Sequence, residues 1–142
     1  MEPTKPSKVQ LPDEGGIADA ARIIAAGGTV AVPTETVYGL AARADSDEAV
    51  AGIYRAKGRP DFNPLIVHVA DATAARALAV FDARADALAS TFWPGALTMV
   101  LPRRNGAPLA PAVSAGLPTV ALRCPAHPVM QALLKTCGLP LA

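Results

Sequence analysis

Apolar positions along the chain follow two alternating periods, a helical one of three to four residues and a strand period of two. Helices are predicted from Asp13 up to Gly27, from a cap at Asp45 or Ser46 up to Lys57, and over residues 73–80, 82–92 and 128–137. Short apolar or β-branched runs predict strands over residues 29–32, 40–44, 65–69, 96–101 and 119–124, with another beginning at 139. Because strands and helices alternate, we predict an α/β domain.

Proline and glycine mark the ends of these elements. Pro33 is expected to end the first strand, since it has no N–H to donate to a ladder, and Gly58 suits the residue after a helix. Three loops are predicted, over residues 34–39, 59–64 and 102–118, and the last has room for one helical turn. A loop of that length within a compact domain is usually functional or mobile.

Strand alternation assigns side chains to opposite faces of the sheet. Val67 and its second neighbours are expected to share one face, whereas Ile66 and His68 point to the other. In the later strand, Thr119 and Arg123 share a face, together with Ala121 between them. An arginine on a central strand must find a carboxylate, a phosphate or water.

Length and composition limit the possible classes of protein. With 142 residues and 51% hydrophobic residues, the chain is expected to form one domain over residues 13–142 after an extended arm over residues 1–12. Net charge is +1, so a general attraction to nucleic acid is not expected. No apolar run is long enough for a membrane span or a signal core, and Cys124 and Cys137 lack metal-site spacing. We therefore predict a cytoplasmic protein without membrane association and with free thiols.

Two stretches carry candidate chemistry before the third strand. Lys57 and Arg59 could converge on an anion at a helix end, although such a pair is more often a solvated helix terminus. The loop around Thr36 and Tyr38 combines hydroxyls, a carboxylate and a phenol, but its threonines could equally serve local turn hydrogen bonds. His68 alone is more often structural than functional. The sequence has no Walker motif, nucleophile elbow or metalloprotease motif, and its carboxylates are too spread out for a metal cage.

Five motifs in order resemble the YrdC-like family of threonylcarbamoyl-AMP synthases. They are Gly27-Gly-Thr-Val-Ala-Val-Pro-Thr-Glu-Thr-Val-Tyr-Gly-Leu40, Lys57-Gly-Arg-Pro60, Asn63-Pro-Leu-Ile-Val-His68, Trp93-Pro-Gly-Ala-Leu-Thr98 and Thr119-Val-Ala-Leu-Arg-Cys-Pro-Ala-His-Pro128. The resemblance implies a YrdC-like α/β fold, with a twisted, open, mixed sheet, flanking helices and a large concave basic cavity. It also implies an enzyme, a nucleotidyltransferase that forms threonylcarbamoyl-adenylate and pyrophosphate from L-threonine, bicarbonate and ATP. Its product would serve the N6-threonylcarbamoyladenosine (t6A) modification at position 37 of tRNA.

The resemblance also implies roles for individual residues. Contacts with L-threonine would come from Thr36, Tyr38, His68 and Arg123. Contacts with ATP would come from Lys57, Arg59, Asn63 and Thr119, and Lys57 and Arg59 would be the catalytic cations. No metal ligand is implied, because Mg²⁺ would arrive with the phosphates of ATP.

The resemblance leaves alternatives open. The family continues into a Ser-x-Asn segment that completes the basic cluster, and this chain ends at Ala142 before it, so an inactive fragment that keeps only the fold is one alternative. Another alternative is a module that binds RNA or tRNA, although aromatic residues for base stacking make up only 4% of the chain. A possible partner is tRNA or the tRNA-modifying complex that uses the product. An O-carbamoyltransferase-like relative is disfavoured by the absence of zinc-finger cysteines.

Overall fold

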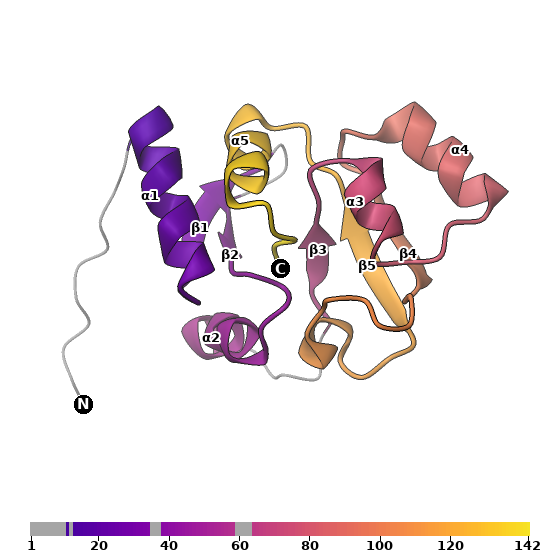
Figure 1. The fold of residues 1–142 in the computed structure, drawn as a ribbon, viewed down its shortest axis with the longest axis horizontal. Coiled ribbons are helices and arrows are strands. Elements are labelled where there is room, and N and C mark those ends of the chain that lie inside the picture. Colours follow the sequence, from indigo (N-terminus) through magenta and orange to yellow (C-terminus); the bar gives the residue numbers. More distant parts are fainter. Residues whose placement is uncertain (1–10, 12, 35–37, 59–63) are drawn as a thin grey trace.

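The computed structural model describes residues 11, 13–34, 38–58 and 64–142, and helices and strands alternate along them (Figure 1). In chain order the elements are α1 (Glu14–Ala25), β1 (Val30–Pro33), β2 (Tyr38–Ala41), α2 (Asp47–Lys57), β3 (Ile66–His68), α3 (Ala72–Arg76), α4 (Ala83–Phe92), β4 (Thr98–Pro102), the 3₁₀ helix η1 (Pro111–Ser114), β5 (Thr119–Arg123) and α5 (Pro128–Cys137). The predicted α/β class is confirmed.

Two sheets form the centre of the fold. Strands β1 and β2 make an antiparallel hairpin, while the second sheet has the order β3-β5-β4. In that sheet β3 runs parallel to β5 and β4 runs antiparallel to it, so the predicted mixed sheet is confirmed.

The last residues of the chain join the two sheets. Leu141 pairs with Arg43 on one side and with His68 on the other. Its carbonyl accepts from the His68 N–H at 2.6 Å, and the Ala142 N–H donates to the Ala42 carbonyl at 2.8 Å. The chain end therefore lies between β2 and β3, as Figure 1 shows, and the strand expected to begin at residue 139 appears as a short bridge.

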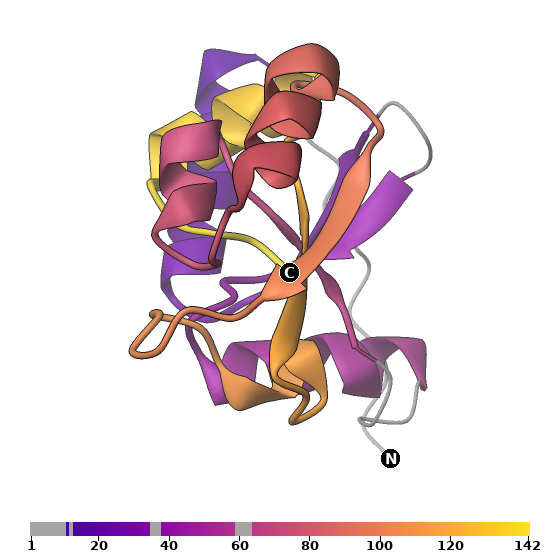
Figure 2. The same ribbon diagram turned by 90° about the vertical axis from the view of Figure 1, so that its right-hand side faces the viewer.

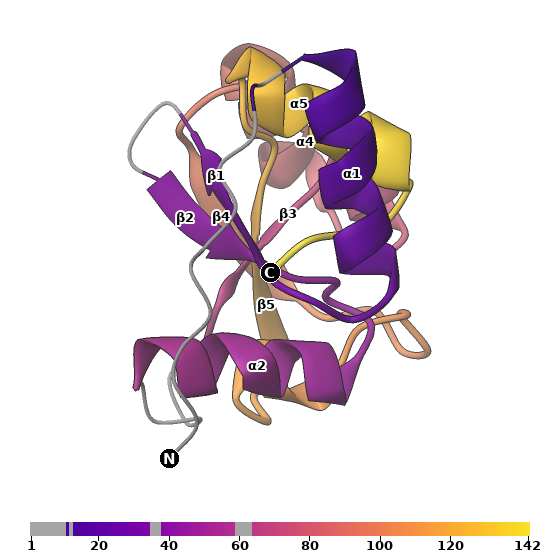
Figure 3. The ribbon, with the colours of Figure 1, turned by 90° about the vertical axis from the view of Figure 1, so that its left-hand side faces the viewer.

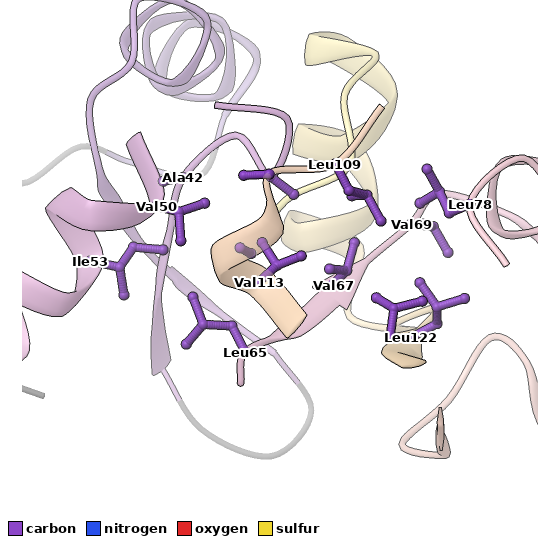
Figure 4. Packing of buried hydrophobic residues seen from close by; sticks show 14 of the residues in the cluster. Ala42, Val50, Ile53, Leu65, Val67, Val69, Leu78, Leu109, Val113 and Leu122 are labelled. Carbon is purple, nitrogen blue, oxygen red and sulfur yellow. The ribbon is translucent and has the colours of Figure 1, made fainter. Parts of the chain in front are cut away.

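The main core lies on one face of the β3-β5-β4 sheet. Val67 and Leu122 are fully buried there, and α2 and η1 contribute Val50, Ile53 and Val113 to the same cluster. Figure 4 shows Val113 between the side chains of α2 and those of β3. The predicted apolar face of α2 and the predicted apolar face of β3 therefore both point into the main core, and η1 packs between them.

A second cluster joins α1 and α5 to the hairpin. Ile24 of α1 packs with Met130 and Leu133 of α5, and Leu141 is buried among them. Figures 2 and 3 show α2 at one end of the molecule, with α1, α4 and α5 gathered at the other. Helices thus flank the sheets from both ends.

The helix ends agree with the capping signals in the sequence. Asp13 caps α1 by accepting from the Gly16 N–H at 2.8 Å, and Ser46, one of two predicted caps, accepts from the Ala49 N–H and caps α2. The other candidate, Asp45, pairs with Arg43 instead. Gly58 ends α2 at a φ of 62°, a left-handed conformation that glycine adopts without steric cost.

Three predicted boundaries were wrong, each because of pairing elsewhere in the fold. Tyr38 was placed in a loop but starts β2, since it pairs with Pro33 across the hairpin. The predicted strand over 40–44 therefore ends at Ala41, although Ala42 and Ala44 still bond to the chain end. The predicted helix over 73–80 is reduced to α3, because the Val80 N–H donates to Pro102 and residue 79 forms a bridge.

The remaining shifts are small. Strand β4 begins two residues later than predicted and includes Pro102, which lies on an outer strand of the sheet where a missing N–H is tolerated. Strand β5 ends at Arg123, one residue early. The long loop over 102–118 contains one helical turn, η1. Within the described part of the chain, no helix is long and apolar enough to cross a membrane.

Candidate functional site

The face of the β3-β5-β4 sheet opposite the main core gathers several predicted site residues. We name it the site face, and its members, by strand alternation, are Ile66 and His68 of β3, Thr98 and Val100 of β4, and Thr119, Ala121 and Arg123 of β5. The core face consists of the alternating residues Val67, Met99, Leu101, Val120 and Leu122. The two faces come from the same strands and differ in chemistry.

One row across the site face is polar. His68 and Arg123 are register partners in the parallel pair, and Thr98 is the partner of Arg123 on its other side. Neighbouring strands lie about 4.8 Å apart, so the three side chains leave the sheet beside one another. A guanidinium, an imidazole and a hydroxyl at this spacing can bind a small ligand that carries a carboxylate.

The turn over residues 93–95 fixes the end of β5 that carries Arg123. The Arg123 Nε donates to the Gly95 carbonyl at 3.4 Å, while the Gly95 N–H donates to the Cys124 carbonyl at 2.8 Å. Arg123 is 6% exposed, so its guanidinium is held within the protein. The Trp93-Pro-Gly turn therefore supports the polar row, and the Trp93 Nε1 donates to the Leu97 carbonyl at 2.8 Å within that turn.

The next row of the site face is apolar. Ala121 pairs with Ile66 and with Val100, and those two side chains are 40% and 65% exposed. Two residues along a strand span about 6.6 Å, so this row begins one short step from Arg123. Accessible apolar side chains next to a charged group provide a floor on which a ligand can lie.

Three other predicted site residues lie outside the polar row. Thr119 is the first residue of β5, four residues before Arg123, which corresponds to about 13 Å along the strand. Lys57 is the last residue of α2 and is exposed. Tyr38 starts β2 and is 76% exposed. The polar row and Thr119 thus mark two ends of one face.

Three predicted site residues, Thr36, Arg59 and Asn63, lie outside the described residues. Their assigned roles stay predictions, as do those of the residues on the site face. The large concave basic cavity and the extended arm over residues 1–12 also stay predictions.

Among the described residues, two surface hollows lie away from the site face. One lies between the end of α1 and the start of α2 and is lined by Arg43, Ser46 and Glu48, among others. The other lies between α3, α4 and α5 and is lined by Arg76, Trp93 and other residues. Neither is lined by His68, Arg123 or Thr119, so these predicted site residues lie outside both hollows. Among the described residues, no group of three or more His, Cys, Asp or Glu could hold a metal ion.

Several titratable groups away from the site face have shifted pKa values. Arg43 donates to Asp45 from Nε at 2.6 Å, and this bond lowers the pKa of that carboxyl. A backbone N–H at the start of α4 lowers the pKa of Asp82, its cap. Burial raises the pKa of the Cys137 thiol, and neither Cys124 nor Cys137 forms a disulfide. These groups stabilise helix ends and junctions.

Sequence reasoning missed the part of the site face that β4 and the apolar row provide. Thr98 and Val100 become neighbours of β5 only through strand register. Alternation alone could have placed Ile66 with His68 on one face, but it could not say which strand lies beside it. Register is set by the tertiary fold, and the sequence carries no direct signal for it.

Taken together, these residues form an α/β domain whose mixed sheet carries a polar row beside an apolar row on the face opposite the main core. The model of the Sua5/YciO/YrdC family, which bears the description telomere recombination, matches residues 22–142. The chain belongs to that family.

Similar proteins carry a consistent name. The threonylcarbamoyl-AMP synthase of Bacillus subtilis is 51% identical over 127 residues, which are 89% of this chain and 36% of that protein. The protein of the same name from Pyrococcus abyssi is 45% identical over 131 residues, which are 92% of this chain and 38% of that protein. A crystal structure of P. abyssi Sua5 complexed with L-threonine superposes with a TM-score of 0.87 at 44% identity, over 92% of this chain and 38% of that one. The chain thus spans little more than a third of the length of these relatives.

Proposed function

We propose that this chain is the part of a threonylcarbamoyl-AMP synthase that binds L-threonine and presents it to ATP and bicarbonate. The observation that carries the proposal is the register of His68 with Arg123 on adjacent strands of the site face. Support also comes from the names of the relatives and from the P. abyssi structure described with L-threonine.

The polar row suits an amino acid. Arg123 can bind the threonine carboxylate through two parallel N–H groups, which is the geometry that a guanidinium offers. The threonine amine must be neutral to attack a carbon atom, and the His68 imidazole is an acceptor that can take one of its protons in a hydrogen bond. Thr36 and Tyr38 complete the threonine end in this proposal.

The proposed reaction has two bond-forming steps. The amine of threonine attacks the carbon of bicarbonate, water leaves, and a carbamate forms. A carbamate oxygen then attacks the α-phosphorus of ATP and pyrophosphate leaves, which gives threonylcarbamoyl-adenylate. Since no covalent intermediate with the protein is needed, orientation and charge stabilisation provide the catalysis.

The ATP end of the proposal uses Lys57, Arg59, Asn63 and Thr119. The cations would oppose the charge that develops on the phosphates, and Mg²⁺ bound to those phosphates would add to that effect. In this proposal the metal ion enters with its nucleotide. The t6A modification of tRNA as the use of the product, and a cytoplasmic location, stay predictions.

The test is release of pyrophosphate from ATP by the purified chain. We expect release only when L-threonine and bicarbonate are both present, and we expect omission of either to abolish it. His68→Asn is expected to reduce the rate, while His127→Asn serves as the matched control, because His127 only caps α5. Release that does not require threonine, or no release at all, would contradict the proposal for this chain.

A further inference from the structure

We propose that Arg103 is a positioning residue for the nucleotide end of the site, an inference that rests on the proposed function. Arg103 follows β4 and its side chain turns into the loop that contains η1. Its guanidinium donates to the carbonyl oxygens of Leu109 and Ala110 and to the Ser114 hydroxyl, the last two at 3.3 and 3.4 Å. One side chain thus closes the loop over residues 104–114.

The groups that Arg103 binds lie in the interior. Ser114 is 1% exposed and Ala110 is 3% exposed. A buried carbonyl or hydroxyl that loses its donor carries an uncompensated desolvation cost, so the loop has a strong preference for the arrangement that keeps Arg103 in place. Figure 4 shows Leu109 and Val113 of this loop with their side chains in the main core.

Two elements that lead into the predicted nucleotide site bond to η1. The Tyr54 hydroxyl of α2 donates to the Ala112 carbonyl at 3.3 Å, and the Leu65 N–H, just before β3, donates to the Val113 carbonyl at 2.9 Å. Tyr54 is one turn before Lys57, the exposed cation at the end of α2. The position of η1 therefore fixes the end of α2 that carries Lys57.

The Arg103 side chain also reaches the segment before β5. It donates to the Ser114 hydroxyl, and the Ser114 carbonyl accepts from the Leu117 N–H at 2.9 Å, two residues before Thr119. Lys57 and Thr119 are the two described residues predicted to contact ATP, and the Arg103 side chain is connected to both through η1 and Ser114. The threonine end of the site does not depend on η1 in this way, because the backbone pairing of β3 with β5 aligns His68 with Arg123.

The test compares ligand affinities of the chain and its variants by titration calorimetry, with Mg²⁺ and a non-hydrolysable ATP analogue in one series and L-threonine in the other. We expect Arg103→Met to weaken binding of the nucleotide about tenfold or more, since small displacements of positioned groups have effects of that order, while affinity for threonine changes less than about twofold. Arg103→Lys keeps one donor group, so its affinity for the nucleotide should lie between that of the unchanged chain and that of Arg103→Met. Arg104→Met is the matched control, because Arg104 donates instead to the Arg76 carbonyl, and it should bind both ligands as the unchanged chain does.

Hydrogen exchange provides the second measurement. Arg103→Met should speed exchange of the Leu65 and Ala110 amide protons, and should leave that of His68, which bonds to Leu141, unchanged. Equal loss of affinity for both ligands, or no loss for either, would overturn the proposal. An unchanged chain that binds neither ligand would instead overturn the proposed function, and exchange at Leu65 would still show whether Arg103 holds η1.

Discussion

Along β5, alternate residues point to opposite sides of the sheet, and the two sides have different partners. Leu122 is fully buried beneath helices, whereas Ala121, its neighbour, lies between two accessible side chains on the site face. On the core face, packing alone accounts for each residue. On the site face, a buried arginine and exposed apolar groups lie side by side, an arrangement that packing does not require. Residues of the core face are thus explained by stability, whereas those of the site face are the ones that we propose for ligand binding.

The largest expected effect comes from the core face. Leu122→Ala removes a fully buried side chain from the centre of the main core, so we expect it to lower the free energy of unfolding by about 2–5 kcal/mol. The measurement is urea denaturation followed by circular dichroism. Val100→Ala, on the site face and 65% exposed, is the control, with an expected change within about 0.5 kcal/mol. A comparable loss from both variants would show that the site face is packed like the core face.

The second prediction removes the charge of the buried arginine on the site face. Arg123→Met keeps the length and bulk of the side chain but removes its charge, so we expect affinity for L-threonine to fall by about 10- to 100-fold. Stability should change little, because an apolar group of similar volume can replace a buried charge without loss. Titration calorimetry gives the affinity and urea denaturation the stability.

Arg84→Met is the control for that charge removal. Arg84 is highly exposed, and its contact with Asp82 is at 3.7 Å. We expect its affinity for threonine to match that of the unchanged chain. If Arg123→Met lost stability while keeping its affinity, Arg123 would belong with the core residues.

Local signals in the sequence predicted the elements of the core face well. Helical spacing located α2 and α4, and a Ser46 cap and a Gly58 end followed from rules of helix termini. Alternation along β3 and β5 correctly separated Val67 and Leu122, which the structure buries, from the residues of the opposite face. These properties depend on a few neighbouring residues, and so the sequence expresses them directly.

The site face could not be predicted from any one segment, because it depends on which strands pair in the fold. His68 and Arg123 were separately assigned to strand faces, but only the parallel pairing of β3 with β5 makes them neighbours. Arg103 showed no local signal either, since Arg103 and Arg104 are two adjacent cations in a loop and only the fold distinguishes them. The helix predicted to run to residue 80 ended early for the same reason, because backbone pairing with Pro102 outweighed helix propensity.

The smallest effect concerns the junction between the helices of the two clusters. Arg43 donates to the Ala25 carbonyl at the end of α1 and to Asp45, which precedes the α2 helix on the core face. The pKa of Asp45 is lowered in the folded chain, so its stabilising contribution is complete above the unfolded value of about 4 and is lost as pH falls through the lower folded value.

We expect Asp45→Asn to lower the free energy of unfolding by about 0.5–1 kcal/mol at pH 7, and the difference from the unchanged chain to shrink towards pH 3. Urea denaturation at several pH values measures it, with Asp86→Asn as the control, since Asp86 pairs with Arg76 on the exposed surface and should matter less. A pH-independent difference would show that Asp45 acts through shape and not through charge, and that packing alone joins the helices that serve the two faces.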